Sequence, residues 1–517
     1  MKTVFVLFDS LNRHMLGPYG GTRIPTPNFD RLAARSVTFD RHYVGSLPCI
    51  PARRDMLTGR LSFLHRSWGP LEPFDNAFPE RLYRAGVYSH LVTDHHHYFE
   101  DGGATYHNRY DSYEFVRGQE GDAWKAMVQP PWERLREMYH ERQFDTAQRS
   151  YPRKNVVNRE FIREESEFPS VQVFAHGLEF LERNRTADNW LLQIETFDPH
   201  EPFVAPARFK KPFETGWNGP IRDWPRYGRV DELPAECEEL RANYYAVVSL
   251  CDFLLGQLLD DFDRHDMWKD TALVVTTDHG FLLGEHDFWA KNRMNLYEEL
   301  VHIPLFLHDP RASHLAGTRS AALTQTIDMA ATFLDLHGVA PPAENEGHSL
   351  LKTRTGTPVR EAALFGYFGG AVNVTDGRYT YHRFPADLSK QEIYQYTVMP
   401  THIWDFFPPE ELAEATLSEP FPFTKGAKLL KVPVGERSPM YNTYGPGALL
   451  EDDTRLYDLA TDPGQEKPLA DAAVEARMVE LMTGLMRAND APPEAFARLG
   501  LAPDGTRIAG AAAKTVA

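Results

Sequence analysis

The sequence predicts an α/β fold, with a large, mainly parallel sheet flanked by helices and a smaller C-terminal α+β subdomain. Continuous apolar runs such as Val4–Phe8 are typical of strands covered on both faces of a parallel sheet. Strand-like and helix-like segments alternate up to about residue 380, which is the pattern of such sheets. The chain then changes to short β segments, prolines and a terminal helix. We therefore predict a first domain at residues 1–380 and a C-terminal subdomain at residues 381–517.

The expected elements follow one another in order. We expect strands at Val4–Phe8, Ser36–Phe39, Tyr88–Thr93, Trp190–Thr196, Thr271–Thr277 and Ile303–His308. We expect helices that begin near Thr26 or Asn28 and that cover Phe78–Ala85, Val171–Asn184, Arg241–His265, Thr324–Leu336 and Ala472–Asn489. Residues from about 110 to 170 have weak periodicity, so we interpret them as an insertion over one face of the sheet, either a lid or a contact surface. We expect a mobile tail from about Arg507.

Composition restricts the partners of this protein. The chain has 517 residues, of which 42% are hydrophobic, and this suits a globular protein with a sizeable core. The formal net charge of −18 argues against a nucleic-acid partner, because phosphate binding needs a basic surface. It also means that an anionic substrate needs a local cationic pocket.

The sequence gives no sign of export or of disulfides. The apolar run after Met1 is too short for a signal peptide or a membrane span, and we find no other stretch that approaches a span. We therefore expect no membrane partner and a cytoplasmic location. Three cysteines (Cys49, Cys237 and Cys251) cannot form a disulfide framework, and only Cys49 has a distinctive setting.

Cys49 is expected at the start of a short helix. Pro51 suits the first turn of that helix, and Gly59 suits the position just after its end. The N-terminus of a helix favours negative charge, so this is a place to handle an anion. A buried structural cysteine in a turn is the alternative, and geometry alone does not separate the two.

Polar residues follow four of the expected strands. They are Asp9, Asp94 with His96, the loop from Asp198 to His200, and Asp278 with His279. Any single aspartate here could simply cap a helix, but ligands in open α/β sheets bind beyond the carboxyl ends of the strands. Asp9, Asp278 and His279 form a candidate cation site. Carboxylates suit a hard divalent ion, and an imidazole shifts the preference toward Mn²⁺.

These residues resemble a known family. Cys49-Ile50-Pro51-Ala52-Arg53 resembles the C-x-P-x-R signature of type I sulfatases, which belong to the alkaline-phosphatase-like superfamily. Five further segments match other motifs of the family and occur in the family's order, one before Cys49 and four after it: Pro25–Leu32, Gly86–His96, Asp198–Phe203, Asp278–Lys291 and Leu456–Pro463. In this family the cysteine is converted to formylglycine, whose hydrated gem-diol is the nucleophile.

The chain departs from the family pattern at four places. Ser10 stands where many sulfatases have a second aspartate, and Asn12 stands in place of an arginine. His279 replaces a common asparagine, and Asp94 replaces a lysine. Ser10, Asn12 and Asp94 are therefore further candidates for the site. The first and third departures resemble the phosphonate monoester hydrolase branch and the arylsulfatases close to it.

The resemblance implies a role for each candidate residue. Asp9, Asp278 and His279 would hold one divalent ion, Ca²⁺ or Mn²⁺, together with the nucleophile derived from Cys49. Arg53 would hydrogen-bond the nucleophile, and Lys291 and His200 would contact the substrate oxygens, one of them protonating the alcohol. His96 would be the base that takes the proton of the second gem-diol hydroxyl, which expels sulfate and restores the aldehyde.

The implied substrate is a small sulfate ester, and an arylsulfatase-like activity is expected. The implied protein partners are a formylglycine-generating enzyme during maturation and further copies of the chain in a dimer or tetramer. Two alternatives stay open: a phosphonate monoester or phosphodiester hydrolase with the same site, and an inactive protein that binds sulfate esters through an unmodified Cys49.

Overall fold

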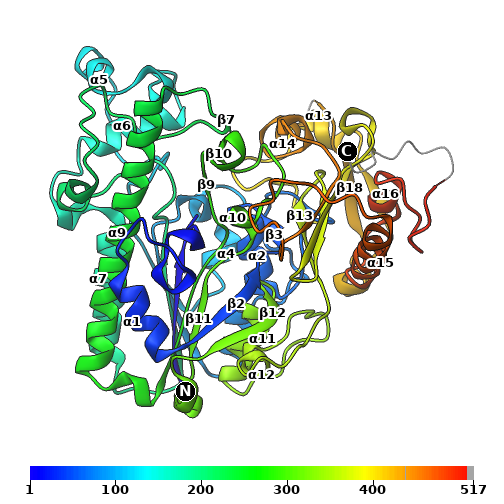
Figure 1. The fold of residues 1–517 in the computed structure, drawn as a ribbon, viewed down its shortest axis with the longest axis horizontal. Coiled ribbons are helices and arrows are strands. Elements are labelled where there is room, and N and C mark those ends of the chain that lie inside the picture. The colour runs from blue at the N-terminus through cyan, green and yellow to red at the C-terminus, as the bar shows by residue number, and fades with distance from the viewer. Residues whose placement is uncertain (437, 509–517) are drawn as a thin grey trace.

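The computed structural model describes residues 1–436 and 438–508 (Figure 1). In this part of the chain, eight strands form the main sheet. Their order is β12 (Arg319–Gln325), β2 (Val37–Tyr43), β11 (Leu305–His308), β8 (Thr271–Thr277), β1 (Lys2–Phe8), β6 (Trp190–Thr196), β4 (Tyr88–Thr93) and β5 (Ser112–Phe115). All neighbouring pairs are parallel except those that involve β11, which is antiparallel to β2 and β8. The predicted large, mainly parallel sheet is confirmed.

Helices cover both faces of this sheet because its strands are apolar on both faces. Val4, Val6 and Phe8 of β1 belong to one core cluster, together with residues of α1 (Pro27–Arg35), α7 (Pro169–Asn184) and α9 (Pro234–Arg264). Phe5 and Leu7 belong to the opposite cluster, with residues of α2 (Cys49–Thr58), α3 (Phe78–Arg84) and α11 (Asp328–Leu336). Side chains alternate along a strand, so each face buries its own set.

A second sheet joins the C-terminal part of the chain to the segment before Cys49. Its order is β19 (Arg455–Asp458), β15 (Tyr379–Arg383), β14 (Val372–Thr375), β13 (Ala363–Tyr367) and β3 (Ser46–Leu47). Helix α15 (Ala472–Ala488) packs on this sheet, as Figure 1 shows at the right. The second sheet takes strands from both sides of residue 380, and the domain boundary there stays a prediction.

Several predicted boundaries are wrong. Helix α9 begins at Pro234 rather than Arg241, with proline in its first turn. The helix expected from Thr324 begins at Asp328, because Arg319–Gln325 is strand β12, which the sequence analysis missed. The expected tail begins with Arg507 and Ile508, and its remaining residues lie outside the described part of the chain.

The segment from about 110 to 170 has more structure than its weak periodicity predicts. It contributes edge strand β5 and helices α5 (Trp132–Met138) and α6 (Tyr151–Arg159). Figure 1 shows α5 and α6 at the upper left, beyond the end of the sheet toward which β1 runs. This is the side on which the polar strand ends lie.

Helix α9 is long and apolar enough to cross a membrane, which the sequence analysis overlooked. It packs between α1 and α7, and 72% of its most apolar stretch is buried inside the protein. Its composition is therefore accounted for by its place in the core.

Candidate active site

Cys49 lies at the start of α2, among the polar residues that follow β1 and β8. Its Sγ atom is 3.3 Å from Nε2 of His279 and 3.4 Å from Nζ of Lys291. The distance from Sγ to Oδ1 of Asp9 is 3.9 Å. Cys49 is only 2% exposed, and burial, together with the charge of Asp9, raises the pKa of its thiol well above the usual value. An unmodified Cys49 is therefore a poor thiolate nucleophile.

The helix that carries Cys49 is fixed at both ends, as its sequence predicts. Pro51 lies in the first turn, and Gly59 ends the helix at φ 71°, in the left-handed region. The carboxylate of Asp55 accepts bonds from the backbone amides of Ser46 and Ser62 at 2.7 and 2.9 Å. These bonds tie the helix to β3 before it and to the turn after it.

Arg53 binds three carboxylates one turn after Cys49. Its guanidinium lies 3.0 Å from Asp9, 2.5 Å from Asp278 and 2.6 Å from Glu195. Nη1 also donates to the carbonyl of Cys49 at 3.2 Å. Arg53 and its three partners are fully buried, so these ion pairs are shielded from solvent.

Glu195 is a site residue that the sequence analysis missed. It lies near the end of β6 and also accepts bonds from Tyr98 and Gln193 at 3.1 and 2.8 Å. A single buried glutamate in an apolar strand is the signal that could have revealed it, because buried carboxylates need a partner.

Lys291 and Ser10 complete the surroundings of Cys49. The ammonium of Lys291 donates to Oγ of Ser10 at 3.0 Å, and Ser10 donates to Oδ1 of Asp9 at 2.7 Å. Burial opposes the charge on Lys291, but Cys49, Glu201, Asp9 and Asp278 together raise its pKa above the usual value. Lys291 therefore stays a cation in this pocket.

The donor set around Cys49 fits a divalent metal ion. Ligand atoms of Asp9, Cys49, Asp278 and His279 lie within 4.8 Å of one another, and all four side chains are buried. Nδ1 of His279 is 2.8 Å from the carbonyl of Gly280, which leaves Nε2 free as a ligand atom. Burial lowers the pKa of His279 to about 3, so its ring is neutral. Burial and the nearby Asp278 raise the pKa of Asp9 to about 7. A bound cation would relieve the repulsion between the two carboxylates.

His200 lies in the loop after β6. It comes directly after the cis peptide bond between Asp198 and Pro199. Its Nδ1 is 2.6 Å from the carbonyl of Glu201, and burial, together with Lys291, lowers its pKa well below the usual value. Glu201 is 1% exposed and accepts a short bond from Tyr227. Burial raises the pKa of Glu201 to about 8.

Two of the predicted candidates, Asn12 and Asp94, bond to neighbouring loops. Asn12 bonds the carbonyl of Phe281 and the amide of His14, at 2.9 and 2.8 Å. Asp94 accepts from the amide of Phe197 at 2.7 Å and from Gln119 at 3.1 Å. Both therefore hold loops in place.

His96 lies farther out, where its Nε2 is 3.0 Å from Glu120. Its neighbours His95 and His97, which the sequence analysis does not single out, are 0% and 5% exposed. His95 also lies 3.7 Å from the carboxylate of Asp9.

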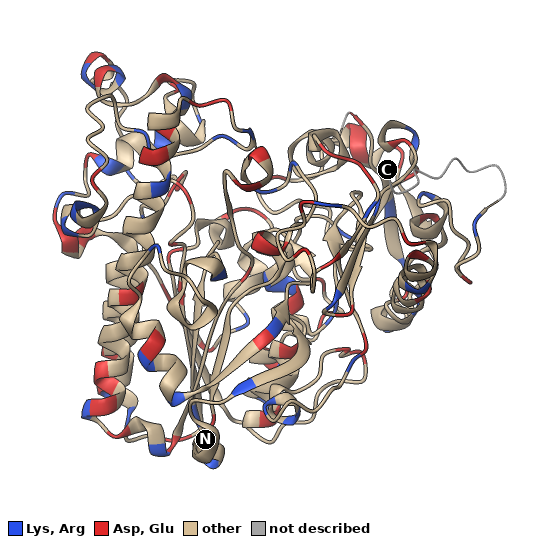
Figure 2. Ribbon diagram, viewed as in Figure 1, with Lys and Arg blue, Asp and Glu red and all other residues tan. Residues whose placement is uncertain are grey.

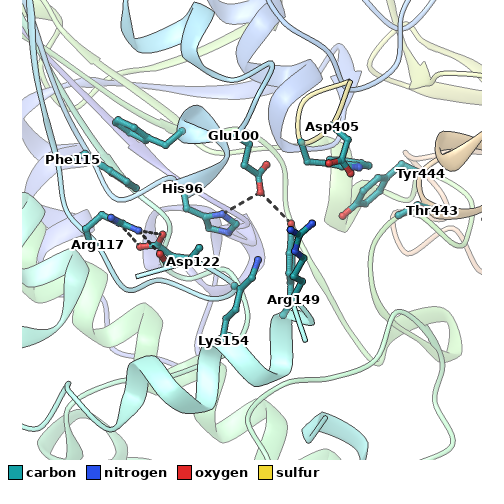
Figure 3. A pocket seen from close by; sticks show the side chains of 15 residues that line it. His96, Glu100, Phe115, Arg117, Asp122, Arg149, Lys154, Asp405, Thr443 and Tyr444 are labelled. Carbon is teal, nitrogen blue, oxygen red and sulfur yellow. Dashed lines mark hydrogen bonds and ion pairs between the residues drawn. The ribbon is translucent and has the colours of Figure 1, made fainter. Parts of the chain in front are cut away.

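A cavity of about 770 Å³ opens beside His96 (Figure 3). Its walls come from the insertion, with Arg117, Arg149, Tyr151 and Lys154, and from the C-terminal part of the chain, with Trp404 and Tyr444. Tyr444 stacks on Trp68, with ring centroids 4.5 Å apart. Three acidic side chains, Glu100, Asp122 and Asp405, also line the cavity, and Asp122 pairs with Arg117 at 2.7 Å. Figure 2 likewise shows basic and acidic residues interspersed over the molecule.

Comparisons with known proteins agree with this arrangement. The model of the sulfatase family matches residues 2–339, and that of the N-sulphoglucosamine sulphohydrolase C-terminal region matches residues 284–416. A choline-sulfatase of Rhizobium meliloti is 25% identical over 418 residues, which is 73% of this chain and 77% of that protein. An arylsulfatase of Clostridium perfringens is 23% identical and covers 67% of this chain and 77% of its own length.

Two solved structures share this fold. BT4656 in complex with its substrate D-glucosamine-2-N,6-O-disulfate has a TM-score of 0.65 and 17% identity, and covers 95% of this chain and 99% of its own. The phosphonate monoester hydrolase of Agrobacterium radiobacter has a TM-score of 0.61 and 17% identity, and covers 95% of each chain.

Proposed function

Because this chain belongs to the sulfatase family and is a sulfuric ester hydrolase, we propose that it cleaves sulfate monoesters with a formylglycine made from Cys49. The observation that carries this proposal is the buried group of Cys49, Arg53 and Lys291 next to the donor set of Asp9, Asp278 and His279. A nucleophile, fixed cations and metal ligands then meet at one point.

The proposed reaction has two steps. One hydroxyl of the gem-diol loses its proton and attacks sulfur, the S–O bond to the alcohol breaks, and the departing oxygen takes up a proton to leave as the alcohol, so that the sulfate stays attached to residue 49. The second hydroxyl then loses its proton, the C–O bond to the sulfate breaks, and the aldehyde is restored as sulfate leaves. A divalent ion held by Asp9, Asp278 and His279 would lower the pKa of the attacking hydroxyl and offset negative charge.

The side chains of the site divide the remaining work. Arg53 holds the two metal-binding carboxylates in place and contacts the backbone of Cys49. Lys291 keeps its proton, so we assign to it the stabilisation of the departing oxygen. With Nδ1 of His200 directed at the carbonyl of Glu201, its Nε2 is an acceptor, which suits a base better than an acid. The sequence analysis predicts His96 as the base of the second step, but its Nε2 is engaged by Glu120 at 3.0 Å, so we assign this role to His200.

Maturation must precede folding in this proposal. Cys49 is 2% exposed and lies behind Lys291 and His279, so a modifying enzyme cannot reach its Sγ atom in the folded chain. We propose that a formylglycine-generating enzyme acts on the segment from Cys49 to Arg53 while it is still unfolded.

The cavity favours a sulfate ester of a ring-shaped alcohol. Tyr444, Trp404 and Tyr151 provide aromatic surfaces, and aromatic rings and sugar rings both pack on such surfaces. We propose arylsulfatase-like activity as the first to assay. The expected cytoplasmic location, the absence of a membrane partner and the dimer or tetramer stay predictions.

A phosphonate monoester or phosphodiester hydrolase is the second candidate. It is favoured by Ser10 and His279, which depart from the usual sulfatase pattern. It is also favoured by a similar protein from Trinickia caryophylli, which is named as a multifunctional alkaline phosphatase superfamily protein. That protein is 25% identical, over 63% of this chain and 71% of its own length.

A panel of aryl sulfate, aryl phosphonate monoester and phosphodiester substrates tests the proposal. Protein made together with the maturating enzyme should cleave the sulfate with the highest kcat/KM, and Cys49→Ala should lose this activity. Cys237→Ala is the matched control, since Cys237 lies on α9, away from the site. Faster cleavage of the phosphonate would favour the second candidate, and equal activity of Cys49→Ala would exclude both.

A further inference from the structure

The histidine-rich turn after β4 carries a second group of ligand atoms, separate from the one around Cys49. His96, His97 and Glu120 each offer one ligand atom, and these atoms lie within 4.8 Å of one another. The three side chains are buried, with exposures of 4%, 5% and 7%. We propose that His96, His97 and Glu120 bind a second divalent transition-metal ion, such as Zn²⁺, in the wall of the cavity.

Glu100 bonds the ring of His97 and lies near that of His96. Its carboxylate lies 2.6 Å from Nδ1 of His97 and 3.8 Å from Nδ1 of His96. A carboxylate at the Nδ1–H of a histidine leaves Nε2 as the ligand atom and increases its basicity, as is common around protein-bound metals. Figure 3 shows Glu100 and His96 facing each other across the upper side of the cavity.

The spacing of the donors suits a small ion. Nε2 of His96 lies 3.0 Å from Oε2 of Glu120, and the rings of His96 and His97 have centroids 4.3 Å apart. Two nitrogen or oxygen ligand atoms, each about 2.0–2.1 Å from one tetrahedral zinc ion, are about 3.3 Å from each other. Only small side-chain movements therefore separate this arrangement from a coordinated one.

The donor set differs from that of the first site and selects a different class of ion. Two imidazoles and one carboxylate are the ligands of catalytic zinc and of related transition-metal sites that keep a coordination position open. His96 also lines the cavity, so an open position can be reached from there by water or by an anionic group of a ligand. The site around Cys49 has two carboxylates and one imidazole.

The backbone at Glu120 supports a specific role for its side chain. Glu120 has φ 39°, a left-handed conformation that is unfavourable for a residue other than glycine. Such conformations persist mainly at functional sites, where a side chain must point in a fixed direction. Here it directs the carboxylate toward His96 on one side, and a ligand atom of Glu120 lies within 4.8 Å of those of His200 and Glu201.

Cobalt binding tests the second site without relying on activity. The full-length protein is freed of metal with a chelator and titrated with Co²⁺, whose visible absorption is strong in four-coordinate sites and weak in six-coordinate ones. The wild-type protein should bind two equivalents, one with strong absorption. Asp278→Asn should lose the weakly absorbing equivalent and keep the strong one. A wild-type protein that binds one equivalent, lost in Asp278→Asn, would overturn the proposal.

Variants of the second site provide the converse measurement. His97→Ala should lose the strongly absorbing equivalent of Co²⁺ and keep the other. Glu120→Gln keeps the size of the side chain and should give the same result, so it serves as the test variant if His97→Ala does not fold. His176→Ala is the matched control, because His176 also lies beside a glutamate, 2.9 Å from Glu114, but is 38% exposed. Strong Co²⁺ absorption retained in both site variants, or lost in the control, would mean that these residues do not bind the ion.

Discussion

The ammonium of Lys291 lies 3.4 Å from Sγ of Cys49 and bridges it to the hydroxyl of Ser10, 3.0 Å away. In a protein with a formal net charge of −18, we propose that this buried cation attracts an anionic substrate to residue 49. Because Ser10 stands where many sulfatases have an aspartate, Lys291 here bonds a hydroxyl and keeps its charge available for a substrate.

Replacing Lys291 by methionine should therefore impair the chemical step. Methionine keeps most of the length of the side chain but removes the charge, so we expect kcat/KM for an aryl sulfate to fall on the order of 10²- to 10³-fold. Steady-state kinetics of protein with equal formylglycine content measure this. The control is Lys269→Met, whose ammonium is 63% exposed beside Asp266. A loss below threefold in Lys291→Met would remove Lys291 from the site.

Arg53 should be required for stability as well as for activity. Arg53→Met leaves the buried carboxylates of Asp9, Asp278 and Glu195 without their common partner, which should lower the free energy of unfolding by roughly 3–5 kcal/mol. Urea unfolding of metal-free protein measures this loss.

Arg208→Met is the matched control for Arg53→Met. Arg208 also bonds a carboxylate with two nitrogens, 2.7 Å from Glu165, but both side chains are well exposed. The expected cost of this change is below about 1 kcal/mol. Equal losses in the two variants would contradict the importance of burial.

His279 should set the metal preference of the site around Cys49. His279→Asn replaces an imidazole by an oxygen ligand, so we expect the selectivity to move from Mn²⁺ toward Ca²⁺. Competition between the two ions, measured by elemental analysis after dialysis, reports this change. Asp278→Asn is the comparison that weakens binding of both ions. An unchanged ratio of Mn²⁺ to Ca²⁺ in His279→Asn would show that His279 is not a ligand.

Glu201 should make the folded state less stable as the pH rises. Burial raises its pKa from 4.5 to about 8, so between these values the folded chain holds a proton that the unfolded chain has released. Stability from this group is complete below about pH 4.5 and declines up to pH 8, by at most about 1.4 kcal/mol per pH unit. Glu201→Gln does not titrate, so the difference in unfolding free energy between wild type and variant should shift in the variant's favour from pH 5 to pH 8. A constant difference would mean that Glu201 is ionised throughout.

The sequence predicts those parts of this site that depend on local pattern. Apolar runs identify β1, β4, β6 and β8, so the positions of Asp9 and Asp278 follow directly. The N-terminal position of Cys49 in its helix follows from Pro51 and Gly59, each of which has a backbone preference of its own.

Features that depend on distant contacts could not be predicted. Arg53 meets Glu195 across 142 positions: a glutamate in the apolar strand β6 indicates that it needs a partner, but nothing local identifies Arg53 as that partner. The antiparallel direction of β11 depends on how the chain returns to the sheet. The burial of His97 could not be predicted either, because it depends on Trp68 and Glu100, which pack against it only in the folded chain.

Mass spectrometry of the peptide that contains Cys49 tests the central claim most directly. The peptide is taken from active protein made together with a formylglycine-generating enzyme, and aldehyde content is compared with specific activity over several preparations. We predict the mass of formylglycine at residue 49, with activity proportional to the converted fraction. Full activity in protein whose Cys49 is entirely an unmodified thiol would contradict it.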